Sequence, residues 1–192
     1  SCTDLSTTEA TLRALTEIAP TYLIFGNHET DFSPEMRDKF IQIVINSGAV
    51  LLNNKTARLR IRGRDISLCG LELPSTVYKK NGKYKNLDTV DASQIHDTLG
   101  NKPDCKTILA VHNPLFAQSY AQWGADFAVC GHVHGGVVRI PFTGVGLLSP
   151  ERRLLPKYSK GNYTVGNMQL LVSGGLGKLR LFNPPEIVVY EL

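Results

Sequence analysis

Short apolar runs alternate with amphipathic segments along the chain, and the two patterns predict different elements. Continuous apolar runs bounded by proline or glycine are typical of buried strands. We expect such strands at 21–25, 49–52, 57–63, 65–71, 106–111 and 126–130, with closing strands in 168–177 and 186–192. The runs 57–63 and 65–71 flank a tight turn at Gly63 and predict a hairpin.

Two capping boxes predict helix starts, because in each box the side chains of the first and fourth residues satisfy free backbone N–H groups. Ser6 and Glu9 form one box, and Asp91 and Gln94 form the other. The first helix would then show one apolar face, made by Leu12, Leu15 and Ile18.

Two further helices are predicted by their caps and by their apolar spacing. Ser33 is a suitable N-cap with Pro34 at the first helical position, and Gly48 ends that helix. Residues 114–123 read as a short helix. Strands thus alternate with helices, which predicts a single α/β domain over residues 1–192. The irregular segment 141–163 is predicted to be a long functional loop.

The composition narrows the class of protein. The net charge of +4, from 21 basic and 17 acidic residues, is too small to predict nucleic-acid binding, although basic residues cluster at 55–64, 79–85 and 152–160. The apolar fraction of 42% is ordinary for a globular protein, and no apolar run is long enough to span a bilayer. The four cysteines are widely spaced, which favours reduced, structural thiols and a cytoplasmic or cytoplasm-facing location.

Histidines follow three of the predicted strands. His28 comes after the first strand in "GNHE", His112 follows the fifth in "VHNP", and His132 and His134 follow the sixth in "GHVHGG". Ligand sites in open α/β sheets form at the carboxyl ends of strands, so we expect these side chains to converge. Imidazole is a good ligand for zinc, manganese and iron, and the amide oxygen of Asn27 is a suitable neighbouring donor. The flanking glycines would allow the tight turn that the histidine pair needs.

His28 taken alone is also compatible with a structural role at the end of a strand, satisfied by backbone groups. The remaining histidine, His96, lies within a predicted helix and is expected to be exposed without a partner. Glu29 is compatible with orienting His28 and equally with simple solvation.

The three motifs, in this order and spacing, resemble those of the calcineurin-like metallophosphoesterases. The continuation "GHVHGGVVRIPFTGVG", "GNY" and "LLVSGGLGKLRLFNPPEI" further resembles the YkuE-like branch, whose relatives hydrolyse phosphodiester or pyrophosphate bonds, including that of UDP-2,3-diacylglucosamine. The resemblance implies a four-layer sandwich of two mixed β-sheets flanked by helices.

The resemblance also implies roles for individual residues. Asn27, His112 and His132 would bind one divalent metal ion, and His134 would bind a second, with Mn, Fe or Zn as the metals. His28 would be the catalytic residue beside the phosphate, stabilising charge or protonating the leaving oxygen. Two such cations would activate a water molecule for in-line attack on a small phosphoester substrate.

The chain departs from the family pattern in one respect. The family's Asp-x-His and Gly-Asp motifs are absent, so three usual ligands are missing and the expected fold lacks its N-terminal strands. Metal binding by this chain would therefore be weaker than with the complete set of ligands. An alternative is therefore a catalytically degenerate scaffold that binds proteins, against which the intact "GNHE" argues. A structural zinc site is disfavoured because no cysteine lies near the histidines.

The segment 141–163 is amphipathic, with leucines interleaved among basic residues. It is compatible with packing over the site, which we favour, and with contact to a lipid-linked substrate or a membrane surface. The location is accordingly expected to be cytoplasmic or membrane-associated.

Overall fold

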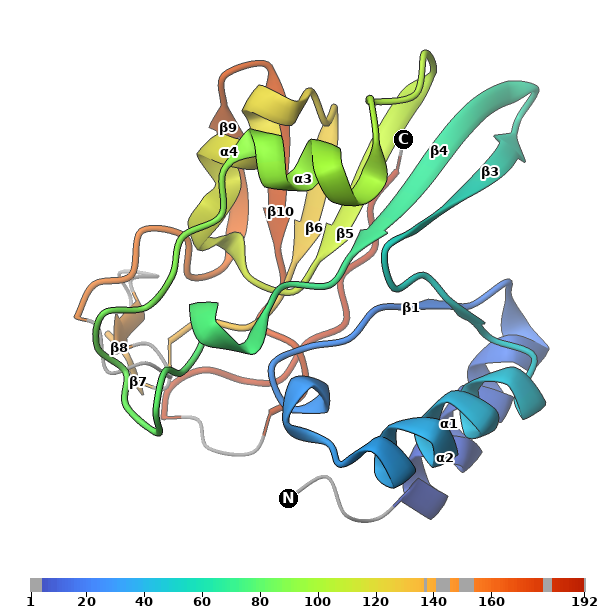
Figure 1. Ribbon diagram of the computed structural model, residues 1–192, viewed down its shortest axis with the longest axis horizontal. Helices are drawn as coiled ribbons and strands as arrows, with labels where there is room; N and C mark the ends of the chain where they lie inside the picture. Colours follow the sequence, from blue (N-terminus) through green and yellow to red (C-terminus); the bar gives the residue numbers. More distant parts are fainter. Residues whose placement is uncertain (1–4, 137, 141–145, 149–153, 178–180, 192) are drawn as a thin grey trace.

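A six-stranded mixed sheet forms the centre of the larger part of the molecule (Figure 1). The computed structural model describes residues 5–136, 138–140, 146–148, 154–177 and 181–191. The strand order is β3 (Lys55–Ile61), β4 (Arg64–Leu71), β5 (Lys106–Val111), β6 (Phe127–Cys130), β10 (Met168–Val172) and β9 (Gly161–Val165). The four central strands are parallel, while β3 and β9 are antiparallel edges. The carboxyl ends of the central strands therefore lie at one end of the sheet.

Two helices, α3 (Ala92–Leu99) and α4 (Ala117–Trp123), cover one face of this sheet (Figure 1). A short 3-10 turn, η3 (Pro114–Phe116), leads into α4. The Asp91 carboxylate accepts the Gln94 backbone N–H, and the Gln94 side chain accepts the Asp91 N–H, which confirms the predicted capping box. Side chains without solvent exposure fill the space beneath the helices: Cys69, Ile95, Leu109, Val111, Tyr120, Ala128 and Leu170.

Residues 5–54 form a smaller unit with its own apolar core, which we call the N-terminal unit. It contains α1 (Leu5–Ile18), β1 (Tyr22–Leu23), α2 (Pro34–Asn46) and β2 (Val50–Leu51), with β1 and β2 paired in parallel. The Ser33 hydroxyl accepts the Met36 N–H and caps α2, as its sequence predicts. Five buried side chains make the core: Leu12, Phe25, Phe40, Val44 and Ala49.

A third, small sheet follows the histidine pair. It consists of β7 (Val138–Arg139) and β8 (Gly146–Leu148), and single bridges extend it through Leu181 on one side and Leu154 on the other. Part of the segment predicted as an irregular loop is therefore strand, because β8 lies within it and β9 begins at Gly161. Residues 141–145 and 149–153 of that segment lie outside the described residues.

The first helix differs from its prediction in its cap and in its apolar face. It begins at Leu5, so Ser6 lies within the first turn and is not the N-cap, and Glu9 pairs with Arg13 one turn later. Leu12 is buried, but Leu15 and Ile18 are exposed. The apolar spacing of α1 therefore extends beyond the surface that its neighbours cover.

Two predicted strands are shorter than expected or absent. The run 21–25 pairs only at Tyr22–Leu23, because the backbone N–H of Phe25 is donated to the side chain of Asn53 instead of to a strand. Residues 186–191 form no strand, and Ile187 and Val189 are exposed. An alternating pattern makes a strand only where a neighbour supplies hydrogen bonds. Among the described residues, this segment belongs to none of the sheets.

The composition also gave expectations about the cysteines and about membrane-spanning helices. Cys69 and Cys130 are buried free thiols, and Cys105 is a half-buried one, as predicted, while Cys2 lies outside the described residues. Among the helices in the described ranges, none has the length and hydropathy needed to cross a bilayer.

Candidate functional site

Asn27, His112 and His132 lie together where three chain segments leave their strands. His112 directly follows β5, His132 is two residues beyond β6, and Asn27 is four residues beyond β1. The Asn27 Oδ1 and His112 Nε2 atoms are 2.9 Å apart, and the ring centroids of His112 and His132 are 5.0 Å apart. The structure thus brings together three of the five side chains that the sequence singles out.

Burial makes both imidazoles neutral. Removal from water, with smaller contributions from the neighbouring His132, His134 and His28 rings, lowers the pKa of His112 to about 3. Burial likewise lowers the pKa of His132 to about 3, with His134 and His28 as smaller causes. A neutral imidazole has a lone pair available on one nitrogen, which is the form that binds metal ions.

The backbone leaves room for these rings. A Cβ atom at Gly26 would lie 3.0 Å from Cε1 and 3.1 Å from Nδ1 of His112, so glycine gives the ring its space. The Gly131 N–H donates to the His112 carbonyl at 3.0 Å and ties the two strand ends together. The motif "GNHE" therefore has glycine at the position where its backbone approaches the His112 ring.

The turn through "GHVHGG" differs from its prediction. His132 and His134 themselves adopt the left-handed conformation, with φ of +64° and +55°, in addition to Gly135 and Gly136. For a residue with a side chain this conformation costs about 1–3 kcal/mol and persists where surrounding contacts enforce it. One such contact is the Asn183 side-chain amide, which donates to the carbonyls of His134 and Gly136.

His28 and His134 lie at the margin of this group. His28 is exposed, precedes the 3-10 turn η1 (Glu29–Asp31), and lines a cavity of about 210 Å³ together with Asn27 and His132. His134 is half-buried and close enough for its charge to lower the pKa of both buried imidazoles, but it does not line that cavity. Its metal-binding role therefore stays a prediction.

Two other residues that the sequence singled out have other partners. The Glu29 carboxylate accepts the Gly26 N–H at 2.8 Å, so it closes the "GNHE" turn. His96 is exposed, as expected, but it has a partner, because its Nε2 lies 2.9 Å from Asn101 Oδ1. His96 has no place in the site.

Tyr78 is a site residue that the sequence did not indicate. Its buried ring lies 5.0 Å from the His132 ring and 6.1 Å from the His112 ring, between centroids. It follows η2 (Ser75–Val77), in the segment that leaves β4, so the strand-end rule applied to the fourth strand could have found it. The rest of the cavity lining comes from the segment after β1 and from the segment after β4: Thr30, Asp31, Ser75, Lys79 and Tyr84.

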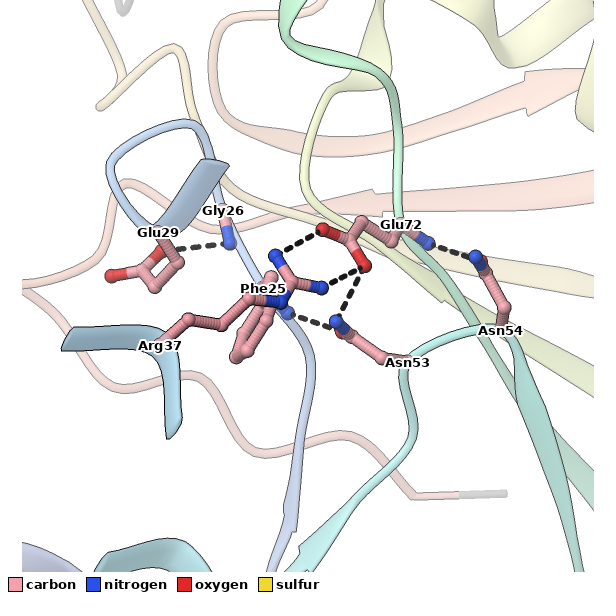
Figure 2. Close-up of polar contacts among 7 residues, drawn as sticks. All are labelled: Phe25, Gly26, Glu29, Arg37, Asn53, Asn54 and Glu72. Atoms are coloured by element: carbon pink, nitrogen blue, oxygen red, sulfur yellow. Dashed lines mark hydrogen bonds and ion pairs between the residues drawn. The ribbon is translucent and has the colours of Figure 1, made fainter. Parts of the chain in front are cut away.

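A polar network connects the N-terminal unit to the sheet (Figure 2). The Arg37 guanidinium donates to both carboxylate oxygens of Glu72, at 3.0 and 2.8 Å, and lies 4.3 Å from the centroid of the Phe25 ring. The Asn53 amide donates to Glu72 at 2.6 Å, and its oxygen accepts the Phe25 N–H at 3.1 Å. Asn54 accepts the Glu72 N–H at 2.9 Å. Because Phe25 is two residues before Asn27, this network sets where Asn27 meets His112.

The donors fit one cation. Two ligand atoms at about 2.1 Å from a metal ion and at right angles lie about 3.0 Å apart, close to the Asn27–His112 separation. One amide oxygen and two neutral imidazoles suit zinc, manganese or iron. Within the described ranges no group of three or more His, Cys, Asp and Glu side chains could hold a metal ion, so neither predicted cation has three such ligands there.

The fold and this arrangement define a class before any comparison is made. The molecule is a mixed α/β protein whose six-stranded sheet presents imidazole nitrogens beyond the carboxyl ends of its strands, where such folds bind ligands, and the loop after β1 adds an amide oxygen.

Comparison with known families then identifies the chain. Residues 2–136 match the family model of the calcineurin-like phosphoesterases, so the chain belongs to this family of metallophosphoesterases. It is 27% identical over 184 residues to phosphodiesterase YaeI of Escherichia coli, covering 94% of this chain and 61% of that protein. It is 31% identical over 137 residues to the metallophosphoesterase YkuE of Bacillus subtilis, covering 61% of this chain and 46% of that protein. The chain thus spans less than two thirds of the length of these relatives.

A solved structure shares the fold. The sulfate thiohydrolase SoxB of Thermus thermophilus superposes with a TM-score of 0.52 at 14% identity, over 88% of this chain and 30% of that one. The predicted α/β fold of the calcineurin-like class is confirmed, with a six-stranded mixed sheet and flanking helices.

Proposed function

We propose that the protein is a metal-dependent phosphodiesterase that hydrolyses phosphodiester or pyrophosphate bonds. The observation that carries the proposal is the meeting of Asn27, His112 and His132 beyond the carboxyl ends of strands, with a half-buried and a buried imidazole that are both neutral. Membership of the calcineurin-like family and the similarity to a phosphodiesterase support the reaction class.

In this proposal each residue has a separate task. Asn27, His112 and His132 hold a divalent cation, which when bound supplies positive charge to polarise a phosphoryl oxygen and activate water. His28 is exposed at the same cavity, where it can donate a proton to the leaving oxygen. Tyr78 packs against the His132 ring and keeps it from turning away.

The cavity also bears on the substrate. Its volume of about 210 Å³ accommodates a phosphate group and its immediate substituents, so the remainder of a larger substrate would lie outside. Lys79 lines the cavity and places positive charge there, which favours an anionic ester. UDP-2,3-diacylglucosamine and nucleotide diesters both meet these requirements.

The test is hydrolysis of bis(p-nitrophenyl) phosphate by protein expressed from its complete gene, with Mn²⁺, Zn²⁺ or Mg²⁺ added. We expect His112→Ala and His132→Ala to abolish turnover and His28→Ala to lower kcat by about 10²–10⁴-fold. His96→Ala is the matched control, because that histidine is exposed and remote from the site. Wild-type turnover that survives both His112→Ala and His132→Ala would refute the proposal.

The same experiment distinguishes an enzyme from a non-catalytic scaffold that binds proteins. That alternative is favoured by the incomplete donor set for a second cation among the described residues. A protein that binds a cation, hydrolyses no diester and is unaffected by His28→Ala would be a scaffold.

A further inference from the structure

The hairpin formed by β3 and β4 is one of three strongly basic segments of the chain. Residues 55–71 include five basic residues and one acidic residue, Asp65. The whole chain has 21 basic and 17 acidic residues, so the rest of it has 16 of each and no net formal charge. Residues 79–85 and 152–160 each contain four basic residues and no acidic one, so the hairpin is one of several sources of the net charge of +4.

The arginines of the hairpin have no counterions in the described structure. Arg58, Arg60, Arg62 and Arg64 are exposed, and within the described residues none of their guanidinium groups forms an ion pair or a hydrogen bond. Like charges this close repel one another, so the cluster is unfavourable for the free protein. Figure 1 shows the hairpin tip projecting beyond the body of the molecule. The tip is thus a free cationic projection.

The charges surround the tip instead of covering one side. Ile61 is paired with Arg64 and Arg60 with Asp65, and successive pairs point to opposite faces of the ribbon. Arg62 and Gly63 form the turn itself, with φ of +50° and +79°. A tip with cations on both faces fits a flat anionic surface met end-on. A polyanion lying along one face would be contacted by only some of them.

Apolar side chains accompany the cations. Ile61, at the end of β3, is 42% exposed. A cavity of about 440 Å³ beside it is lined by Ile61, Arg62, Arg64, Ile66, Lys106 and Phe127. This mixture suits a phospholipid headgroup, whose phosphate would meet the guanidinium groups while its glycerol region meets the apolar floor. Residues 55–71 contain no aromatic side chain on which a nucleic-acid base could stack.

We infer that the β3–β4 hairpin docks end-on against an anionic phospholipid membrane. The basic side chains are attracted to the surface potential, and Ile61 enters the headgroup region. The histidine site lies at the other end of β5, about 20 Å away for a strand of six residues, and remains open to solution. The inference does not depend on the proposed phosphodiesterase activity.

Vesicle co-sedimentation tests it. Wild-type protein is mixed with phosphatidylcholine vesicles, with or without 30% phosphatidylglycerol, in about 0.1 M salt and again in 0.5 M salt. The variant Arg60→Gln/Arg62→Gln/Arg64→Gln removes three charges from the tip. The control Lys39→Gln/Lys83→Gln/Lys85→Gln removes three from exposed positions elsewhere. Thermal melts of both variants verify folding.

We expect wild-type protein to bind only the anionic vesicles and to dissociate in 0.5 M salt. The tip variant should lose on the order of 100-fold in partitioning, since each cation contributes roughly a fivefold gain, and the control should lose only a few-fold. Ile61→Ser should weaken binding several-fold at unchanged charge. Absence of wild-type binding, or equal losses in the two triple variants, would overturn the inference. So would tighter binding to a fluorescent DNA or RNA duplex than to the vesicles.

Discussion

Glu72 offers the sharpest test of how the site is assembled from two units. Its carboxylate accepts two hydrogen bonds from Arg37 and one from Asn53, and its side chain is only 17% exposed. The substitution Glu72→Ala removes the acceptor of all three bonds. The donors on the N-terminal unit then lose their connection to the segment that follows β4.

The exposure of the side chains involved determines how much unfolding free energy Glu72→Ala is expected to lose. A hydrogen bond to a charged group contributes about 1.5–3 kcal/mol when buried, whereas an exposed ion pair contributes about 0.2–1 kcal/mol. The Arg37 side chain is 36% exposed, so its share lies near the exposed value, and the Asn53 bond lies near the lower buried value. Together they predict a loss of about 2 kcal/mol in the free energy of unfolding, or about 4–8 °C in Tm.

A matched ion pair provides the control. Arg13 and Glu9 are also 2.8 Å apart, but their side chains are 54% and 40% exposed. Urea unfolding should show less than about 0.5 kcal/mol for Glu9→Ala. Cation affinity should fall about tenfold in Glu72→Ala and stay unchanged in Glu9→Ala, because only Glu72 supports the loop that carries Asn27. Equal stability losses in the two variants would refute the reasoning.

Two further predictions concern the space around a ring and the response to acid. Gly26→Ala should cost about 1–3 kcal/mol in urea unfolding, because the new Cβ crowds His112, whereas Gly131→Ala should cost less because its nearest contact is an ordinary 3.9 Å. Equal costs would contradict this explanation. For Asp126, burial raises the pKa, but the Thr107 N–H, Lys102 and Lys106 outweigh it and hold the pKa below its ordinary 3.8. Its stabilisation is therefore complete above pH 3.8 and is lost as the pH falls through the lower folded-state pKa. Asp126→Asn should flatten the fall in unfolding free energy below about pH 4, by about 1 kcal/mol, and an unchanged acid profile would argue against this role.

Local signals account for the parts of the fold that could be predicted from the sequence. The capping box of Asp91 and Gln94, the Ser33 cap and the turn at Gly63 depend on residues within a few positions of one another. Strand length depends instead on distant partners. The run 21–25 therefore ends its pairing early, and residues 186–191, with equally good β-propensity, form no strand.

The candidate site, like the fold, could be predicted only in part from the sequence. His112 and His132 lie within two residues of the ends of strongly apolar strands, so the topology of a parallel sheet brings them together. The Arg37–Glu72 contact spans 35 positions and joins a helix to a loop, and no periodic pattern marks either residue. The left-handed backbone at His132 was also unpredictable, because glycine flanks would normally adopt it and only tertiary contacts impose it on a histidine.

The most direct test of the shared site is cation binding. Equilibrium dialysis of metal-free protein against Mn²⁺ or Zn²⁺ should show a site whose affinity falls at least 100-fold in His112→Ala, and about as far in His132→Ala. His96→Ala should bind like the wild type. If both site variants retain wild-type stoichiometry and affinity, Asn27, His112 and His132 do not form a cation site, and the account of this protein as a metal-dependent phosphodiesterase fails.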